Sequence, residues 1–109
     1  MKFRKERLNS VLRDELSKMI QKEIEFPAGV LATITEVDTA PDFSESKVGV
    51  AVLPSDKSNE VLKILNEQAG HFYSLIFKKL KIYSVPKIKF IYDPGSENAA
   101  RVEEISLKQ

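Results

Sequence analysis

Seven apolar residues near the amino terminus share one face of a helix. Between Arg4 and Glu25 they recur with the spacings 3, 1, 4, 3, 1 and 4, as Leu8, Val11, Leu12, Leu16, Met19, Ile20 and Ile24. Burying these side chains contributes roughly 10 to 20 kcal/mol before conformational entropy is subtracted. Phe26-Pro27 ends the helix, because proline disfavours the α conformation in the preceding residue. The rest of the chain must therefore supply an apolar surface that covers this helix.

Three later segments have the composition and alternation of strands. The first is Val30 to Asp38, with Val30, Ala32 and Ile34 on one side and Leu31, Thr33, Thr35 and Val37 on the other. Turn-forming residues at 39–44 connect it to a second alternating segment, Lys47 to Leu53, which predicts a hairpin. A third strand is expected at Lys87 to Tyr92, with Ile88 and Phe90 on one face and Lys87 and Lys89 on the other.

Helical spacing returns after Pro54-Ser55-Asp56, which ends the second strand and offers an N-cap. A helix-interior glycine costs about 1 kcal/mol relative to alanine, so Gly70 predicts a break, with one helix to about Gln68 and another from about His71 to Lys81. A short final helix is expected over 96–107, and residues 1–5 can form a flexible arm. The order α-β-β-α-α-β-(α) predicts a single α+β domain over 1–109, built as a two-layer sandwich.

The scarcity of reactive side chains excludes several kinds of protein. The chain has no cysteine, which removes disulfides, Cys-based metal sites and thiol nucleophiles. Its single histidine, His71, excludes a two-histidine metal motif. The glycines at 29, 49, 70 and 95 are too far apart for a Walker loop or for the GXXG clamp of KH domains. We therefore expect no enzyme, no metal and no cofactor.

Neither a membrane nor an exported location is expected. The longest stretches without a charged residue are Phe26 to Thr35 and Gln68 to Phe77, whereas a membrane span needs about 20 apolar residues. The basic amino terminus leads into a charged amphipathic segment and lacks the apolar region of a secretory signal. The absence of cysteine suits a reducing cytoplasm.

The net charge of +1 conceals a strongly uneven distribution of charge. Five basic residues and a single acid, Glu6, lie between Met1 and Arg13. Five lysines and no acid lie between Gln68 and Tyr92. If the fold brings these two clusters together on one face, they form a local footprint for phosphate. The simpler alternatives are a solvated surface and cations that favour the carboxyl end of a helix.

Gly70 and His71 also have two interpretations each. The Ala69-Gly70 step removes side-chain bulk, so that either another helix or a nucleic-acid backbone could approach closely, and close helix packing is the safer interpretation. His71 lies near a predicted helix start, where a capping or surface role competes with contact to a phosphate or a base.

Four segments, taken in order, carry a likeness to a known family. They are Ile24-Glu25-Phe26-Pro27, Thr33-Ile34-Thr35-Glu36-Val37, Leu65-Asn66-Glu67-Gln68-Ala69-Gly70 and Val85-Pro86-Lys87-Ile88-Lys89-Phe90-Ile91-Tyr92-Asp93. Together they resemble the bacterial ribosome-binding factor A family, over nearly the whole chain. The resemblance implies a KH-like domain of type II order, α-β-β-α-kink-α-β, with a three-stranded sheet and an Ala-x-Gly kink in place of the GXXG loop. Gly70 matches the glycine of that kink, Gln68 stands at its alanine position, and Tyr73 and Tyr83 stand where members often have arginine.

The resemblance also implies a function and partners. Members of the family bind immature small ribosomal subunits late in assembly and are not catalytic. By analogy the chain would be a cytoplasmic monomer that holds the small-subunit rRNA in a state compatible with maturation and processing, and an assembly GTPase would assist its release. The residues expected to contact RNA are Arg4, Lys5, Arg7, Gly70, His71, Lys78, Lys79, Lys81, Lys87 and Lys89.

Two other classes of function compete with RNA binding. A protein–protein interaction module would use Lys47 to Leu53 as an edge strand, or the final helix, to dock a partner. A small acyl- or phosphate-hydrolysing enzyme would need a general base and an anion hole, which these residues do not assemble.

Overall fold

The computed structural model describes residues 5–81 and 85–94. Along the chain the elements are α1 (Lys5–Glu23), β1 (Leu31–Thr39), β2 (Glu45–Leu53), the short 3-10 helix η1 (Ser55–Lys57), α2 (Ser58–Glu67), α3 (Ala69–Leu80) and β3 (Lys87–Tyr92). This order confirms the predicted α-β-β-α-kink-α-β arrangement. The final helix expected over 96–107 and most of the expected arm, Arg4 included, lie outside the described residues.

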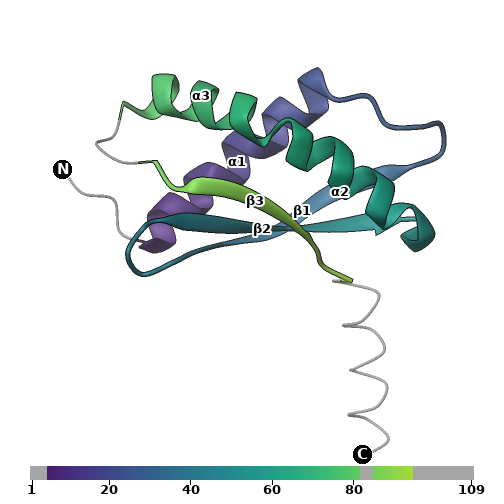
Figure 1. The fold of residues 1–109 in the computed structure, drawn as a ribbon, viewed down its shortest axis with the longest axis horizontal. Helices are drawn as coiled ribbons and strands as arrows, with labels where there is room; N and C mark the ends of the chain where they lie inside the picture. Colours follow the sequence, from purple (N-terminus) through teal and green to yellow (C-terminus); the bar gives the residue numbers. More distant parts are fainter. Residues whose placement is uncertain (1–4, 82–84, 95–109) are drawn as a thin grey trace, which may run out of the picture.

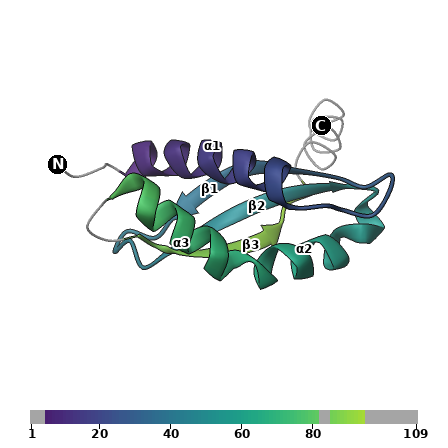
Figure 2. The same ribbon diagram turned by 90° about the horizontal axis from the view of Figure 1, so that it is seen from above.

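The three strands form one mixed sheet in the order β1-β2-β3. β1 and β2 are antiparallel, whereas β2 and β3 are parallel. Within the described residues, α1, α2 and α3 cover the same face of the sheet, so the predicted two-layer architecture is confirmed (Figures 1 and 2). The expectation that Lys47 to Leu53 is an edge strand is wrong, because β3 returns to pair with the outer side of β2.

β3 is an edge strand whose backbone is partly covered. The side chain of Asn66, from α2, donates from Nδ2 to the carbonyl oxygen of Phe90 over 3.0 Å and accepts from the Phe90 amide over 2.9 Å. A side chain that occupies both backbone groups of an edge residue prevents a further strand from pairing there. This arrangement weakens the case for docking a partner strand at β3.

A β-bulge in β1 changes which residues face the core. Ile34 lies opposite Val50 and Val37 lies opposite Val48, so one extra residue is accommodated between them. Ile34 and Val37 are consequently both buried. The strict alternation that placed Val37 on the side opposite Ile34 is therefore wrong at this point.

The apolar stripe of α1 fills the space between the sheet and the other helices. Leu8, Leu12, Leu16 and Ile20 are buried, while Met19 and Ile24 pack at the border of the core. From α3, Phe72 is fully buried and meets Phe90 of β3 edge to face, with ring centroids 6.0 Å apart. The apolar stripe of α1, which we predicted must be buried, thus packs against the sheet.

The break between α2 and α3 falls at Gln68, not at Gly70. Gln68 has φ −97° and ψ 1°, and its amide donates to the Leu65 carbonyl over 3.0 Å, a three-residue reach that tightens the end of α2. The Gln68 carbonyl accepts from the Phe72 amide and begins α3, so Gly70 lies in the first helical turn.

The N-cap predicted at Pro54-Ser55-Asp56 is wrong for α2. The short helix η1 intervenes, and Lys57 precedes α2 without a side-chain cap hydrogen bond.

Gly49 lies next to a hydrogen bond between β1 and the residue that follows β3. Thr35 Oγ1 donates to Asp93 Oδ2 over 2.5 Å, and a Cβ added at Gly49 would lie 2.7 Å from that same Thr35 Oγ1. Gly49→Ala is therefore expected to lower the free energy of unfolding by about 1 to 3 kcal/mol, measured by urea titration. In a Thr35→Ala background the loss should shrink, because the nearest obstructing atom is gone. Equal losses in both backgrounds would show that the crowding is not at Thr35.

Candidate nucleic-acid interface

The two cationic clusters meet at one end of the molecule. Figures 1 and 2 show the start of α1, the end of α3, the start of β3 and the β1–β2 connection at the same end. Lys5 and Arg7 of the first cluster therefore lie at the end that also carries the later lysines, which are Lys78, Lys79, Lys81 and Lys87. The two clusters thus share an end of the domain; the phosphate footprint was predicted for one shared face, which is a stricter condition.

Two contacts join α1 to α3 and occupy two of the predicted site residues. Lys79 Nζ lies 2.8 Å from Glu15 Oε1, and His71 Nε2 lies 2.8 Å from Glu23 Oε1. The pairing of an earlier α1 residue with a later α3 residue shows that the two helices run antiparallel. His71 does not cap α3, because the cap position belongs to Gln68. Lys79 and His71 thus connect helices, which leaves them less available to a ligand.

Lys5 is also engaged within the domain. Its Nζ lies 3.4 Å from Asp38 Oδ1 and links the first turn of α1 to β1. Both side chains are partly exposed, and pairs of this kind typically contribute between 0 and about 1 kcal/mol. Lys5 can therefore exchange Asp38 for another anion at little cost in stability.

A groove of about 480 Å³ runs between α1 and α3, beside the contacts that join them. Its charged lining consists of Glu15, Lys18, Lys22, Glu23, Lys78 and Lys79, with Met19 and Leu75 as the apolar part. Lys18 and Lys22 were not predicted as site residues. They stand four residues apart in α1, beside the buried stripe, but their relation to the α3 lysines appears only when the helices pack.

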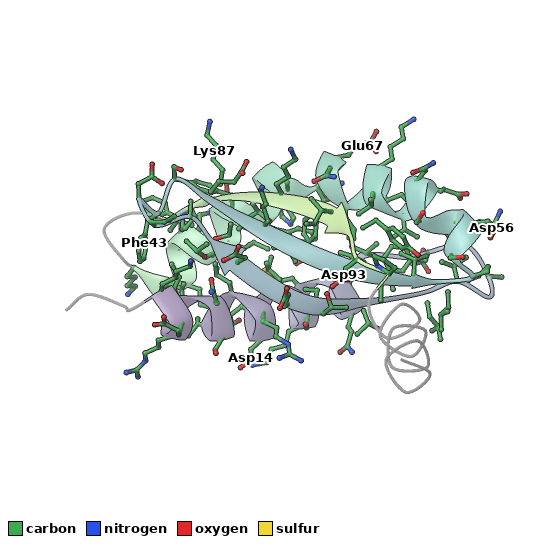
Figure 3. All side chains as sticks on the ribbon, turned by 90° about the horizontal axis from the view of Figure 1, so that it is seen from below. Asp14, Phe43, Asp56, Glu67, Lys87 and Asp93 are labelled. Atoms are coloured by element: carbon green, nitrogen blue, oxygen red, sulfur yellow. The ribbon has the colours of Figure 1, made fainter. Side chains whose placement is uncertain are left out.

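Lys87 and Lys89 project from the opposite layer. Because Ile88 and Phe90 are buried against the helices, the alternating lysines face the uncovered side of the sheet. Lys87 lies opposite Glu45, and Figure 3 shows its side chain extending outward at the edge of the sheet. The expected single cationic face is therefore not formed: the cations share an end of the domain but point from both of its layers.

Some of the predicted lysines make an ion pair within the domain and others do not; we call the latter unengaged. Among the described residues, four of the predicted lysines make no ion pair, and they are Lys78, Lys81, Lys87 and Lys89. Lys81 follows α3 in the left-handed conformation at φ 53°, so the chain turns there towards β3. Three of these four lysines lie where α3 ends and β3 begins.

A carboxylate in the β1–β2 connection lies at the same end. The Ser44 hydroxyl and the Ser44 amide both donate to Asp42 Oδ1, over 2.7 Å and 3.1 Å. These two hydrogen bonds, the hydroxyl first, hold the pKa of Asp42 below its ordinary value. Asp42 therefore stays negative through the physiological range and bounds the cationic region on this side.

Gly70 does not serve close packing within the domain. It is exposed, and a Cβ added there would meet no other atom within 4 Å. The interpretation that the glycine lets another helix of the chain approach is therefore wrong.

Gly70→Ala is expected to raise the free energy of unfolding by about 0.5 to 1 kcal/mol, because alanine suits a helix better than glycine. Thermal unfolding measures this change, and a lower melting temperature would reveal a packing role that the geometry does not show.

Two further classes of site find no support in the described part of the chain. Residues 5–81 and 85–94 contain no group of three or more side chains that could hold a metal ion. No helix within those ranges is long and apolar enough to cross a membrane.

Fold and charge together define a class: a small KH-like α+β domain that lacks a GXXG loop and carries cations where α3 meets β3. The family model described as ribosome-binding factor A matches residues 4–106. The chain belongs to the ribosome-binding factor A family. It is 36% identical over 99 residues to ribosome-binding factor A of Cupriavidus taiwanensis, covering 91% of this chain and 80% of that relative.

Solved structures of relatives have the same fold. A solution structure from Thermotoga maritima, also described as a ribosome-binding factor A, superposes with a TM-score of 0.71 at 29% identity, covering 87% of this chain and 92% of that one. A homology model of the Thermus thermophilus ribosome-binding factor A, fitted into a cryo-EM map of its complex with the 30S subunit, gives a TM-score of 0.67 at 21% identity. It covers 82% of this chain and 94% of that one.

Proposed function

We propose that the chain binds the small ribosomal subunit through its rRNA and acts as a non-catalytic factor in late subunit maturation and rRNA processing. Membership of the ribosome-binding factor A family supports this proposal, as does the cryo-EM map of a 30S complex with the Thermus thermophilus protein, whose crystal structure has the same fold. The observation that carries it is the convergence of unengaged lysines at one end of the domain. Cations so placed bind phosphates and orient the domain without reading base sequence.

The unengaged lysines are the principal phosphate ligands in this proposal. Lys78, Lys81 and Lys87 lie around the junction of α3 and β3, and Lys89 extends the region along the strand. Lys5 and Arg7 contribute from the start of α1. Lys79 and His71 have a structural role, because each contacts a carboxylate of α1 and so connects α3 to α1.

The ionic part of binding is expected to show a definite salt dependence. If about five phosphates are neutralised, the logarithm of the affinity for RNA should fall with the logarithm of salt concentration at a slope near −3.5 on the single-strand scale. Fluorescence anisotropy with a labelled RNA measures the slope, and co-sedimentation tests binding to purified small subunits. A flat salt dependence, or failure to sediment with small subunits, would count against RNA binding.

The proposal includes an oligomeric state, a location and a mode of release. The factor acts as a monomer in the cytoplasm, and an assembly GTPase assists its departure from the subunit. Light scattering after size exclusion tests the first statement, with a mass near the 12.3 kDa of one chain expected. Release is tested by adding the GTPase and GTP to the preformed complex, and an unchanged bound fraction would contradict assisted release.

A further inference from the structure

The outer flank of α3 carries an exposed pair of aromatic rings. Phe77 is 51% exposed and is the aromatic member of the four large apolar side chains that are exposed among the described residues. Its ring lies 6.5 Å from that of Tyr73, centroid to centroid, at an interplanar angle of 34°. Tyr73 is partly buried against the core, so the pair is anchored at one ring and open at the other.

Two further residues continue the same flank. Gly70 precedes Tyr73 by three residues and Tyr73 precedes Phe77 by four, spacings that place these three residues on one side of α3. Lys81 comes four residues after Phe77, at the position that ends the helix. We call Gly70, Tyr73, Phe77 and Lys81 the aromatic stripe. It is distinct from the groove towards α1, which Leu75, Lys78 and Lys79 line from the other flank of α3.

The ends of the aromatic stripe suit a nucleic-acid strand. At one end, Gly70 presents backbone with open space beyond it. At the other end, Lys81 makes no ion pair with a described residue. No acidic residue occurs in the segment from Gln68 to Tyr92, and Glu67 is the nearest acid along the chain at the Gly70 end. Exposed aromatic rings beside cations are the elements from which proteins build stacking platforms for single strands.

We propose that the aromatic stripe binds unpaired bases of single-stranded rRNA, which stack on Phe77 and Tyr73 while the adjoining phosphate contacts Lys81. This proposal rests on the proposed function and adds a second kind of contact to it. Stacking needs no particular base, because every base has a π face. The stripe therefore selects unpaired over paired RNA, because bases inside a duplex are not free to leave their own stack.

Stacking and phosphate contacts leave different experimental signatures. A neutral ring that binds a base displaces no counterions from the RNA. Its removal should therefore lower the affinity for RNA and leave the salt slope constant. Phe77→Leu keeps apolar volume and removes the ring, whereas Phe77→Tyr keeps the ring. Leu53→Ala, on the uncovered face of the sheet at 57% exposure, is the matched control for loss of an exposed apolar side chain.

The experiment measures anisotropy of a labelled 12-nucleotide single strand and of the same strand in a duplex. Phe77→Leu should weaken single-strand binding about 5- to 100-fold with an unchanged salt slope, on the basis of alanine substitutions at stacking sites. Duplex binding should change less than about twofold, and Phe77→Tyr and Leu53→Ala should resemble the wild type. Urea titration of each variant establishes that it is folded.

Contrary outcomes separate the two proposals. Wild-type protein that binds neither RNA at low salt overturns the proposed function itself. Wild-type binding with a normal salt slope, but no difference for Phe77→Leu, overturns only the aromatic stripe. Normal RNA binding by Phe77→Leu combined with weaker co-sedimentation with small subunits would assign the ring to a ribosomal protein, and would likewise overturn base stacking.

Discussion

Reversing two unengaged lysines, as Lys81→Glu with Lys87→Glu, is expected to weaken RNA binding about 10- to 100-fold near physiological salt, because two phosphate contacts are replaced by two repulsions. The salt slope should become shallower by about 1.4, at roughly 0.7 per lost single-strand contact. Neither lysine makes an ion pair with a described residue, so the fold should lose little stability. Anisotropy titrations at several salt concentrations give both quantities, and thermal unfolding checks the fold.

The control at the other end of the domain is Lys57→Glu with Lys63→Glu, which changes the net charge by the same amount and, among the described residues, breaks only the exposed pair of Lys57 with Glu60, at 4.0 Å. Lys57 lies in η1 beside Asp56, which Figure 3 shows at the end of the molecule opposite Lys87. This control should reduce affinity only slightly, through the general field of the protein. If both double variants lose affinity equally, net charge rather than the α3–β3 end governs binding, and the proposed interface is wrong.

Lys79 is unsuitable for this test because its reversal would confuse binding with folding. Glu15 is 15% exposed and accepts Lys79 over 2.8 Å, so a glutamate at position 79 would set two carboxylates against each other. The neutral Lys79→Gln, compared with wild type for unfolding first and RNA binding second, separates the two roles. The inclusion of Lys79 among the RNA-binding residues remains a prediction.

The periodicity of apolar residues was sufficient to predict the elements of the fold. Burial of a helix stripe or a strand face is a local requirement, so α1, β3 and the order of elements follow from spacing. The bulge after Ile34 and the break at Gln68 depend instead on how strands and helices meet. A bulge moves a single residue, and no spacing rule distinguishes Val37 from its neighbours before the register with β2 is known.

The site was less predictable because its contacts join distant segments. Glu15 meets Lys79 and Glu23 meets His71 although the partners lie far apart in the sequence, and no local pattern indicates those pairs. One error was avoidable: Ile88 and Phe90 must face the core, so Lys87 and Lys89 must face away from the helix that carries Lys78. That alternation excludes one shared cationic face and leaves a shared end as the arrangement to expect.

The largest loss of stability is expected at Phe72, which is fully buried and packs edge to face on Phe90. Phe72→Ala should lower the free energy of unfolding by about 3 to 5 kcal/mol, through lost burial and a cavity between α3 and the sheet. Urea titration measures the loss. Should the variant be unfolded without denaturant, Phe72→Leu provides a milder change, with a loss of about 1 to 2 kcal/mol expected from volume reduction.

Phe77→Ala, five residues further along α3, is the control with the opposite expectation. Because Phe77 is 51% exposed, its truncation should lower the free energy of unfolding by about 1 kcal/mol or less. A loss comparable to that of Phe72→Ala would mean that Phe77 is held in the core, and its ring could not serve a ligand. With the expected contrast, one helix divides its aromatic residues between two tasks: Phe72 fixes α3 to the sheet, and that rigid attachment holds Phe77 in place for an incoming base.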